Sequence, residues 1–161
     1  GRVDPVRLGA EGEADEAVKY VTLMENYYAH GKTKKDQEEL TKAQNITIDK
    51  DTVTIAGLKI ERKKSGKAKG KRALEEKEFL PTLEEWQMII DALPGGREWH
   101  KSLQKILGID IYEKSYWGWD SAKSTVIITR MSGLAESRKL NPKTSIDPDE
   151  EACLRFIVRG N

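Results

Sequence analysis

The spacing of apolar residues predicts a helix over residues 14–30. Asp15 lies at its start, where an acidic side chain faces the positive end of the helix dipole, and Gly31 is a natural C-terminal stop. A second helix is predicted over residues 36–44, after a capping box that begins at Thr33. It has few apolar side chains, so we expect it on the surface. The apolar positions of the first helix are Ala17, Val18, Val21, Met24 and Tyr28.

Between residues 45 and 60 the apolar period changes to two, which predicts two or three antiparallel strands. Asp49-Lys50-Asp51 has the chemistry of a turn, and Ala56-Gly57 marks a bulge or tight turn. Threonine and lysine would occupy the solvent-facing side. The alternating positions are Ile46, Ile48, Val53, Ile55, Leu58 and Ile60.

Two further helices are predicted over residues 82–93 and 97–107, each with one apolar stripe. Thr82 begins a capping box in the first helix, and Pro94-Gly95-Gly96 separates the two. Because this connection is short, we expect the helices to pack side by side. The stripes are Leu83, Trp86, Ile89, Ile90 and Leu93, then Trp99, Leu103, Ile106 and Leu107.

Residues 108–131 predict an aromatic β-hairpin with its turn over residues 120–124. Trp117 and Trp119 are two residues apart, so both rings leave the same face of a regular strand. Gly118 between them would let a ligand or a backbone approach closely.

The remaining segments decide the fold class. Residues 73–79 are predicted as a strand and residues 132–146 as a long loop. Residues 147–150 are typical of a helix start, whereas the apolar residues of 154–158 alternate as in a strand. We predict a short helix there, with an edge strand as the alternative. Because regular βαβ alternation is missing, the element order predicts an α+β fold with a mostly antiparallel sheet and helices on one face.

The chain of 161 residues is long enough to bury a sizeable core. Residues 1–13 have no periodicity and predict a flexible arm, followed by a single α+β domain over residues 14–161. Since the chain begins with Gly1 rather than Met, we expect either a piece of a larger polypeptide, whose remainder would be a partner, or residues left by a tag.

Composition limits the chemistry. The 28 basic and 27 acidic side chains nearly cancel, so an electrostatic function requires local segregation of charge. Cys153 is the single cysteine, which excludes an internal disulfide, and with two histidines no Cys/His zinc site can form. No metal or other cofactor is predicted. An intracellular location, cytoplasmic or nuclear, is favoured. No apolar run reaches the length of a membrane span, so no membrane partner is expected.

Charge is segregated between residues 62 and 72, where seven basic residues alternate with Gly, Ser and Ala. We predict a solvated, mobile loop that either binds RNA phosphates or is balanced by the glutamates that follow it. The phosphate-binding candidates are Arg62, Lys63, Lys64, Lys67, Lys69, Lys71 and Arg72.

The aromatic hairpin is the second candidate site. Stacking requires rigid π faces, and each stacked base contributes about 1–3 kcal/mol. On this view Trp117→Ala weakens nucleotide binding and leaves the fold intact. Alternatively, both tryptophans belong to the core and pack on Trp86 or Trp99. The candidate ligand contacts are Tyr116, Trp117, Trp119 and Asp120.

Residues 51–80 contain a strand, a small-residue pair, a second strand, a basic Ser-Gly loop and a Glu-rich segment. This order resembles the opening of the cap-binding domain in the polymerase basic subunit of influenza-type viruses. The resemblance covers less than a fifth of the chain and transfers no cap-binding residue to it. It implies an excised domain of a viral polymerase that binds, or once bound, capped RNA.

These patterns together lead to the hypothesis of a non-catalytic RNA- or nucleotide-binding module. The alternative is a protein–protein interaction or scaffold domain of a larger assembly, with the aromatic hairpin as core. A remote alternative is a metal-dependent nuclease, because Glu75 and Lys77 have the E-x-K spacing of such enzymes, with Asp49, Asp51 or Asp110 as a metal ligand.

Overall fold

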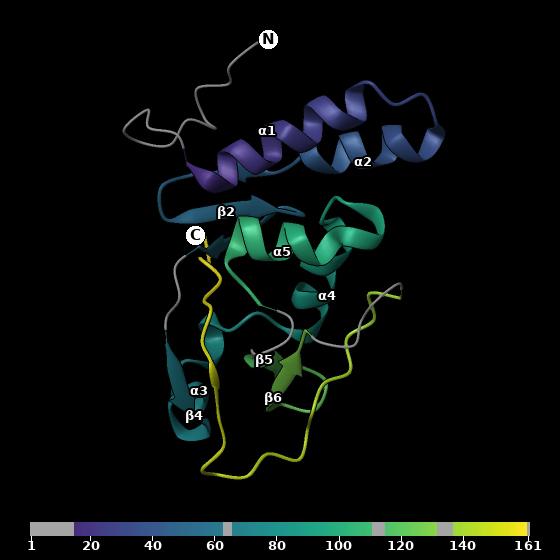
Figure 1. Ribbon diagram of the computed structural model, residues 1–161. Coiled ribbons are helices and arrows are strands. Elements are labelled where there is room, and N and C mark those ends of the chain that lie inside the picture. Colours follow the sequence, from purple (N-terminus) through teal and green to yellow (C-terminus); the bar gives the residue numbers. More distant parts are fainter. Residues whose placement is uncertain (1–14, 63–65, 111–114, 132–136, 161) are drawn as a thin grey trace.

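Two mostly antiparallel sheets and the helices packed on them confirm the predicted α+β fold (Figure 1). The computed structural model describes residues 15–62, 66–110, 115–131 and 137–160. The predicted arm over residues 1–13 lies outside the described residues.

The two predicted N-terminal helices are confirmed as α1 (Glu16–Ala29) and α2 (Lys34–Gln44), which pack against each other. Asp15 caps α1 by accepting a hydrogen bond of 2.8 Å from the backbone N–H of Ala17. Thr33 forms the complete capping box that starts α2. As expected, α2 lies at the surface, and its buried residues are Glu39 and Ala43.

The alternating segment forms a three-stranded antiparallel sheet of β1 (Thr47–Ile48), β2 (Thr52–Ile55) and β3 (Leu58–Glu61). The C-terminal segment adds to the β3 edge of this sheet, because Ile157 forms an antiparallel bridge with Ile60. The residues around Ile157 therefore extend the first sheet.

The second sheet has the strand order β4-β7-β5-β6. Its β5 (Ser115–Asp120) and β6 (Thr125–Arg130) are the predicted aromatic hairpin. Between β5 and β4 (Lys67–Lys69) lies β7 (Glu151–Cys153), antiparallel to β4 and parallel to β5. Strands that are distant in the sequence, β4 and β7, thus pair in one sheet.

The C-terminal helix prediction is wrong. Residues 151–153 form β7, which has a neighbour on each side, and Ile157 then bridges Ile60 at the edge of the first sheet, in agreement with the strand alternative. The helix-start hydrogen bonds do form: the Asp147 N–H donates to Glu150 at 3.1 Å and the Asp149 N–H donates to Asp147 at 3.0 Å. They close a turn instead of starting a helix. Residues 152–155, which follow the turn, are buried, and strand pairing satisfies the backbone of β7.

The predicted strand over residues 73–79 is also wrong. Gly70–Glu75 is helix α3, and Lys77–Phe79 is a 3₁₀ turn. The basic segment is accordingly not one solvated loop, since its second half forms β4 and the start of α3. Glu, Lys, Ala and Leu all favour helix, and burial of Ala73 against the sheet adds to that preference.

The helices α4 (Leu83–Ala92) and α5 (Trp99–Leu107) confirm two further predictions, including the capping box at Thr82. Their expected side-by-side packing is wrong, because α4 packs mainly on β5 and α5 packs mainly on α1. Gly95 and Gly96 have φ angles of 117° and 58°, which redirect the chain between the two helices. Among the described helices, none is long and apolar enough to cross a membrane.

The buried apolar residues form two clusters, and strand β5 contributes to both. Tyr116 belongs to the larger cluster, which joins α1, the first sheet, α4 and α5. Trp117 belongs to the smaller cluster, beneath α3. Because successive side chains of a strand leave opposite faces, the aromatic hairpin separates the two cores. The smaller cluster consists of Ala68, Ala73, Leu80, Trp117, Ile128, Ala152 and Leu154.

Candidate functional site

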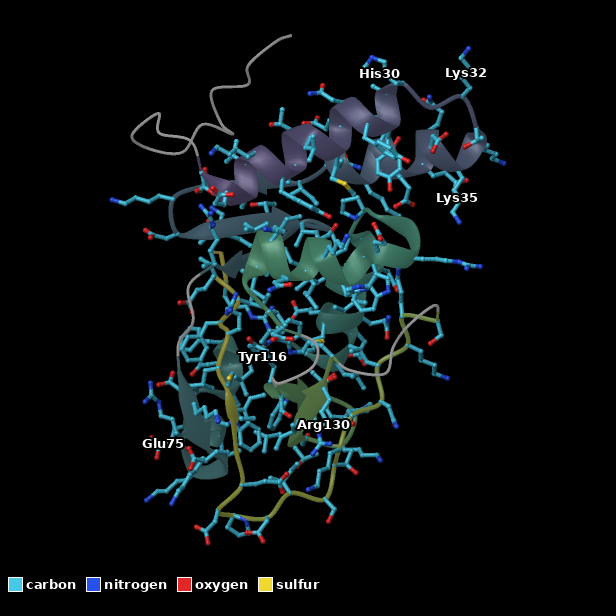
Figure 2. The ribbon with its side chains drawn as sticks, in the orientation of Figure 1. His30, Lys32, Lys35, Glu75, Tyr116 and Arg130 are labelled. Carbon is cyan, nitrogen blue, oxygen red and sulfur yellow. The ribbon has the colours of Figure 1, made fainter. Side chains whose placement is uncertain are left out.

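Tyr116 and Trp117, two of the four predicted stacking residues, are core residues. Their side chains are 1% and 0% exposed, and Figure 2 shows Tyr116 inside the molecule. The Trp117 indole donates a hydrogen bond of 2.8 Å to the carbonyl oxygen of Ala68, and the Tyr116 ring meets Trp86 edge-on at 5.7 Å between centroids. Burial raises the pKa of the Tyr116 hydroxyl. Neither ring offers an open face for a base.

Asp120, the third of these residues, has a structural role in the hairpin turn. It is 9% exposed, and its carboxylate accepts hydrogen bonds from the backbone N–H groups of Ala122 and Lys123, at 3.0 and 3.2 Å. This is the local bonding by which aspartate stabilises turns. The carboxylate oxygen that makes these bonds is thereby engaged within the protein.

Trp119 is the one predicted stacking residue whose ring reaches the surface. It is partly buried against the smaller cluster, and the ammonium group of Lys77 lies 5.3 Å from the centroid of its ring. Its backbone is held by an N–H bond of 2.9 Å to the carbonyl oxygen of Pro81. Trp119 is therefore a rigidly placed aromatic residue at the rim of the second sheet, with a cation over its face.

Gly118 permits a close approach by other residues of the protein rather than by a ligand. A Cβ atom at this position would lie 3.2 Å from the Pro81 carbonyl oxygen, the Ile127 side chain and the Trp86 ring. The glycine between the two tryptophans is thus explained by packing.

The first residue of the basic segment is bound within the protein. Arg62 donates to the carboxylate of Asp15 at 2.7 Å and to the carbonyl oxygen of Asp49 at 2.7 Å. The hydrogen bond from Arg62 lowers the pKa of Asp15. This pair ties the start of α1 to the end of the first sheet, which gives Arg62 a structural role.

The other described cations of the segment remain at the surface. Arg72 pairs with Glu76 at 3.3 Å, and Lys69 lies 3.8 Å from Asp149. Exposed ion pairs of this kind are weak and can be exchanged for a ligand's phosphates. Lys67 and Lys71 are exposed and form no ion pair with a described residue. Lys63 and Lys64 lie outside the described residues.

The tertiary structure places the two predicted patches next to each other. Strand β4, which carries Lys67 and Lys69, belongs to the same sheet as the aromatic hairpin, and α3, which carries Lys71 and Arg72, contacts β6. The bond between Trp117 and Ala68 joins them directly. We call Lys71, Lys77 and Trp119, together with Lys67 on the adjoining edge strand β4, the α3 surface.

A second basic region was not predicted. It is a hollow of about 610 Å³ between α2 and the α4–α5 connection, which we call the α2 hollow. The only sequence signal was the Lys34-Lys35 pair with Lys42 on the same helix, because the other cations are distant in the chain. The lining residues are Lys34, Lys35, Glu38, Glu39, Lys42, Gly96, Arg97 and Arg138.

Arg138 forms the fixed wall of this hollow. Its guanidinium group donates to the carbonyl oxygens of Ile90 (2.9 Å), Leu93 (2.7 Å) and Gly96 (3.0 Å), which caps the C-terminal end of α4. It also lies 5.4 Å from the ring centroid of Trp99. Burial lowers the pKa of Arg138. A positive charge is thus held at a defined position by neutral partners.

The described residues contain no metal site of the kind that the nuclease alternative requires. Glu75 is exposed on α3, and Figure 2 shows its side chain at the periphery of the molecule. Within the described ranges, no group of three or more His, Cys, Asp or Glu side chains is arranged to hold a metal ion.

Comparison with known proteins does not identify a family. No protein-family model, curated protein or solved structure matches the chain. The resemblance of residues 51–80 to a viral cap-binding domain therefore stays a prediction.

Proposed function

We propose that this domain binds RNA or a nucleotide at the α3 surface without catalysing a reaction on it. The observation that carries the proposal is the contact between Lys77 and Trp119, in which an exposed cation covers an aromatic ring at the rim of the second sheet. The ring is held from below by the smaller cluster. Lys71 on α3 and Lys67 on the edge strand β4 are further exposed cations of the same part of the fold.

The chemistry of this contact suits a nucleotide. A base that replaces the Lys77 ammonium on the Trp119 ring gains a stacking contact of about 1–3 kcal/mol. The displaced ammonium is then available for the phosphate that follows the base. With one ring and few phosphate contacts, binding is expected to be weak, tolerant of sequence and strongly dependent on salt.

The experiment is fluorescence anisotropy of a labelled single-stranded RNA at about 50 and 200 mM salt. Trp119→Leu should weaken binding at least about fivefold, as the loss of one stacked base implies. The double variant Lys67→Gln, Lys71→Gln should weaken binding. It should also reduce the slope of log affinity against log salt concentration by the amount expected for about two phosphate contacts. Tyr27→Ala and Lys19→Gln, at exposed positions of α1, are the matched controls.

Two results would contradict this function. One is the absence of RNA binding by the parent protein at the lower salt concentration. The other is an equal loss of affinity in the α1 controls, which would show a non-specific charge effect. The finer proposal of a viral polymerase cap-binding-type domain rests on the resemblance of residues 51–80. It requires that cap analogue competes with the RNA and that unmethylated guanosine triphosphate competes less.

The second candidate is a protein–protein interaction domain, and the apolar outer face of α1 favours it. Leu23 and Tyr27 are 65% and 69% exposed and lie one helical turn apart. The burial of Tyr116 and Trp117 fits this reading, since the hairpin is then core. A longer form of the polypeptide should protect the backbone amides of α1 from hydrogen exchange more than the isolated chain does. Equal exchange in both forms would count against a docking role for this face.

A further inference from the structure

We infer that the α2 hollow is a second anion site, which takes a ligand with a chain of two or more phosphate groups. It is separate from the α3 surface and does not depend on the function proposed there. Its cations come from three parts of the chain: α2, the α4–α5 connection and the segment after β6. Five cationic and two acidic side chains line a space of about 610 Å³.

The acidic residue at the base of the hollow is already neutralised by the protein. Glu39 is 5% exposed, and its carboxylate accepts hydrogen bonds from the backbone N–H groups of Gly95 (2.9 Å) and Gly96 (3.0 Å). The ammonium group of Lys42 lies 3.4 Å from its other oxygen. Successive N–H groups of this kind form an anion-binding concavity, which Glu39 fills. Its charge is directed into the loop, and Glu38 is the remaining acidic side chain of the lining.

The hydrogen bonds of Arg138 do not go to a carboxylate, and the charges of Glu39 and Asp91 act on it only through space. The groups that receive its hydrogen bonds are neutral carbonyls, and Trp99 lies beneath its plane. The guanidinium group is therefore immobilised before any ligand arrives, so little conformational entropy is lost on binding.

Opposite Arg138, the first turn of α2 supplies mobile cations. Lys34 and Lys35 are exposed, and neither forms an ion pair with a described residue. The positive end of the α2 dipole adds to their field. Figure 2 shows Lys35 on the side of α2 that faces the α4–α5 connection, with Lys32 directed away from it. A ligand in the hollow would be held between a rigid wall and these two flexible side chains.

The lining determines which part of a ligand is recognised. No aromatic side chain lines the hollow in the described part of the chain, and the Trp99 ring is covered by Arg138. A base therefore finds no stacking partner here. Cations on both walls match a phosphate chain that is long enough to reach both. The shared chemistry is a polyphosphate, whether it is inorganic or the tail of a nucleoside triphosphate.

The experiment is isothermal titration of the whole chain with inorganic tripolyphosphate, orthophosphate and ATP. Tripolyphosphate should bind, and orthophosphate should bind at least about tenfold more weakly, because it cannot span both walls. The double variant Lys34→Gln, Lys35→Gln should lose at least about tenfold in tripolyphosphate affinity. Lys32→Gln, a lysine just before the same helix that points the other way, should bind as the parent does. The amide resonance of Gly96 should shift on binding.

Several results would overturn the inference. One is the absence of tripolyphosphate binding by the parent protein. Another is a loss of affinity in Lys32→Gln as large as in the Lys34→Gln, Lys35→Gln variant. A third is loss of binding in the Lys67→Gln, Lys71→Gln variant, which would assign the ligand to the α3 surface. ATP that binds tenfold more tightly than tripolyphosphate would show that the nucleoside is recognised, against the assignment. Equal affinities support it. The RNA measurement above is separate, because its key variant, Trp119→Leu, leaves the hollow intact.

Discussion

The indole Nε1 of Trp117 donates a hydrogen bond to the carbonyl oxygen of Ala68, 2.8 Å away, and both residues are buried. The bond reaches across β7, which lies between β4 and β5 in the sheet. It connects the basic segment to the aromatic hairpin and keeps α3 over the smaller cluster. Trp117 is for this reason a residue of the fold, and Trp119 is the one residue of the hairpin left for the proposed ligand contact.

Trp117→Ala should destabilise the protein by about 3–5 kcal/mol, because it leaves a large cavity and an unpaired carbonyl group. This revises the sequence-based expectation that the variant keeps the fold intact. Urea unfolding followed by circular dichroism measures the difference. Trp119→Ala, at the partly exposed neighbouring position, is the control and should cost less. A change below about 1 kcal/mol in Trp117→Ala would contradict the role described here.

Arg155→Met should destabilise the protein by about 2 kcal/mol, because buried carbonyl groups lose their donor. Arg155 is 0% exposed and donates to the carbonyl oxygens of Leu107 and Glu61, the first of which lies at the end of α5. The removal of a buried charge offsets part of this loss. Thermal unfolding should show a lower midpoint than in Arg130→Met, an exposed position of β6. A variant as stable as the parent would mean that desolvation of the guanidinium outweighs its hydrogen bonds.

The ion pair of Asp15 with Arg62 should make stability depend on pH in the acid range. The hydrogen bond from Arg62 lowers the pKa of Asp15 in the folded state below its ordinary value of 3.8. The stabilisation is therefore present above pH 3.8 and is lost as the pH falls through the lower, folded-state pKa.

The measurement is the free energy of unfolding of the parent and of Arg62→Met between about pH 6 and pH 2.5. The variant should be less stable by about 1 kcal/mol at the upper end, and the difference should shrink below the ordinary pKa of the carboxyl group. Lys105→Met, an exposed position of α5, serves as the control for loss of one positive charge. A difference that stays constant with pH would assign the effect of Arg62 to packing alone.

Gly118→Val should destabilise the protein by about 1–3 kcal/mol through overpacking. The added side chain meets the Pro81 carbonyl oxygen, the Ile127 side chain and the Trp86 ring, each only 3.2 Å from its Cβ atom. Gly160→Val is the matched control, because a Cβ atom there has no neighbour within 4 Å. Chemical denaturation distinguishes the two. Equal stabilities would show that the hairpin and α4 can separate at little cost.

Local patterns predicted the elements whose own residues contain the necessary information. The capping boxes at Thr33 and Thr82 and the apolar stripe of α4 were readable because capping and amphipathicity act within a few residues. The hairpin was readable for the same reason. The prediction was wrong over residues 73–79 and at the C-terminus, where local preference competed with packing. The turn at Asp147 makes helix-start bonds, but strand pairing on both sides of β7 prevails.

The sequence by itself determined the α+β class, the order of most elements and the concentration of aromatic and basic residues in two segments. Only the tertiary structure decided that Trp117 lies in the core while Trp119 reaches the surface, and that Arg62 forms an ion pair with Asp15. The same holds for the α2 hollow, where Arg138 meets the lysines of α2. The physical reason is that burial and charge clustering depend on contacts between segments distant in sequence, whereas helix caps and alternation depend on neighbours.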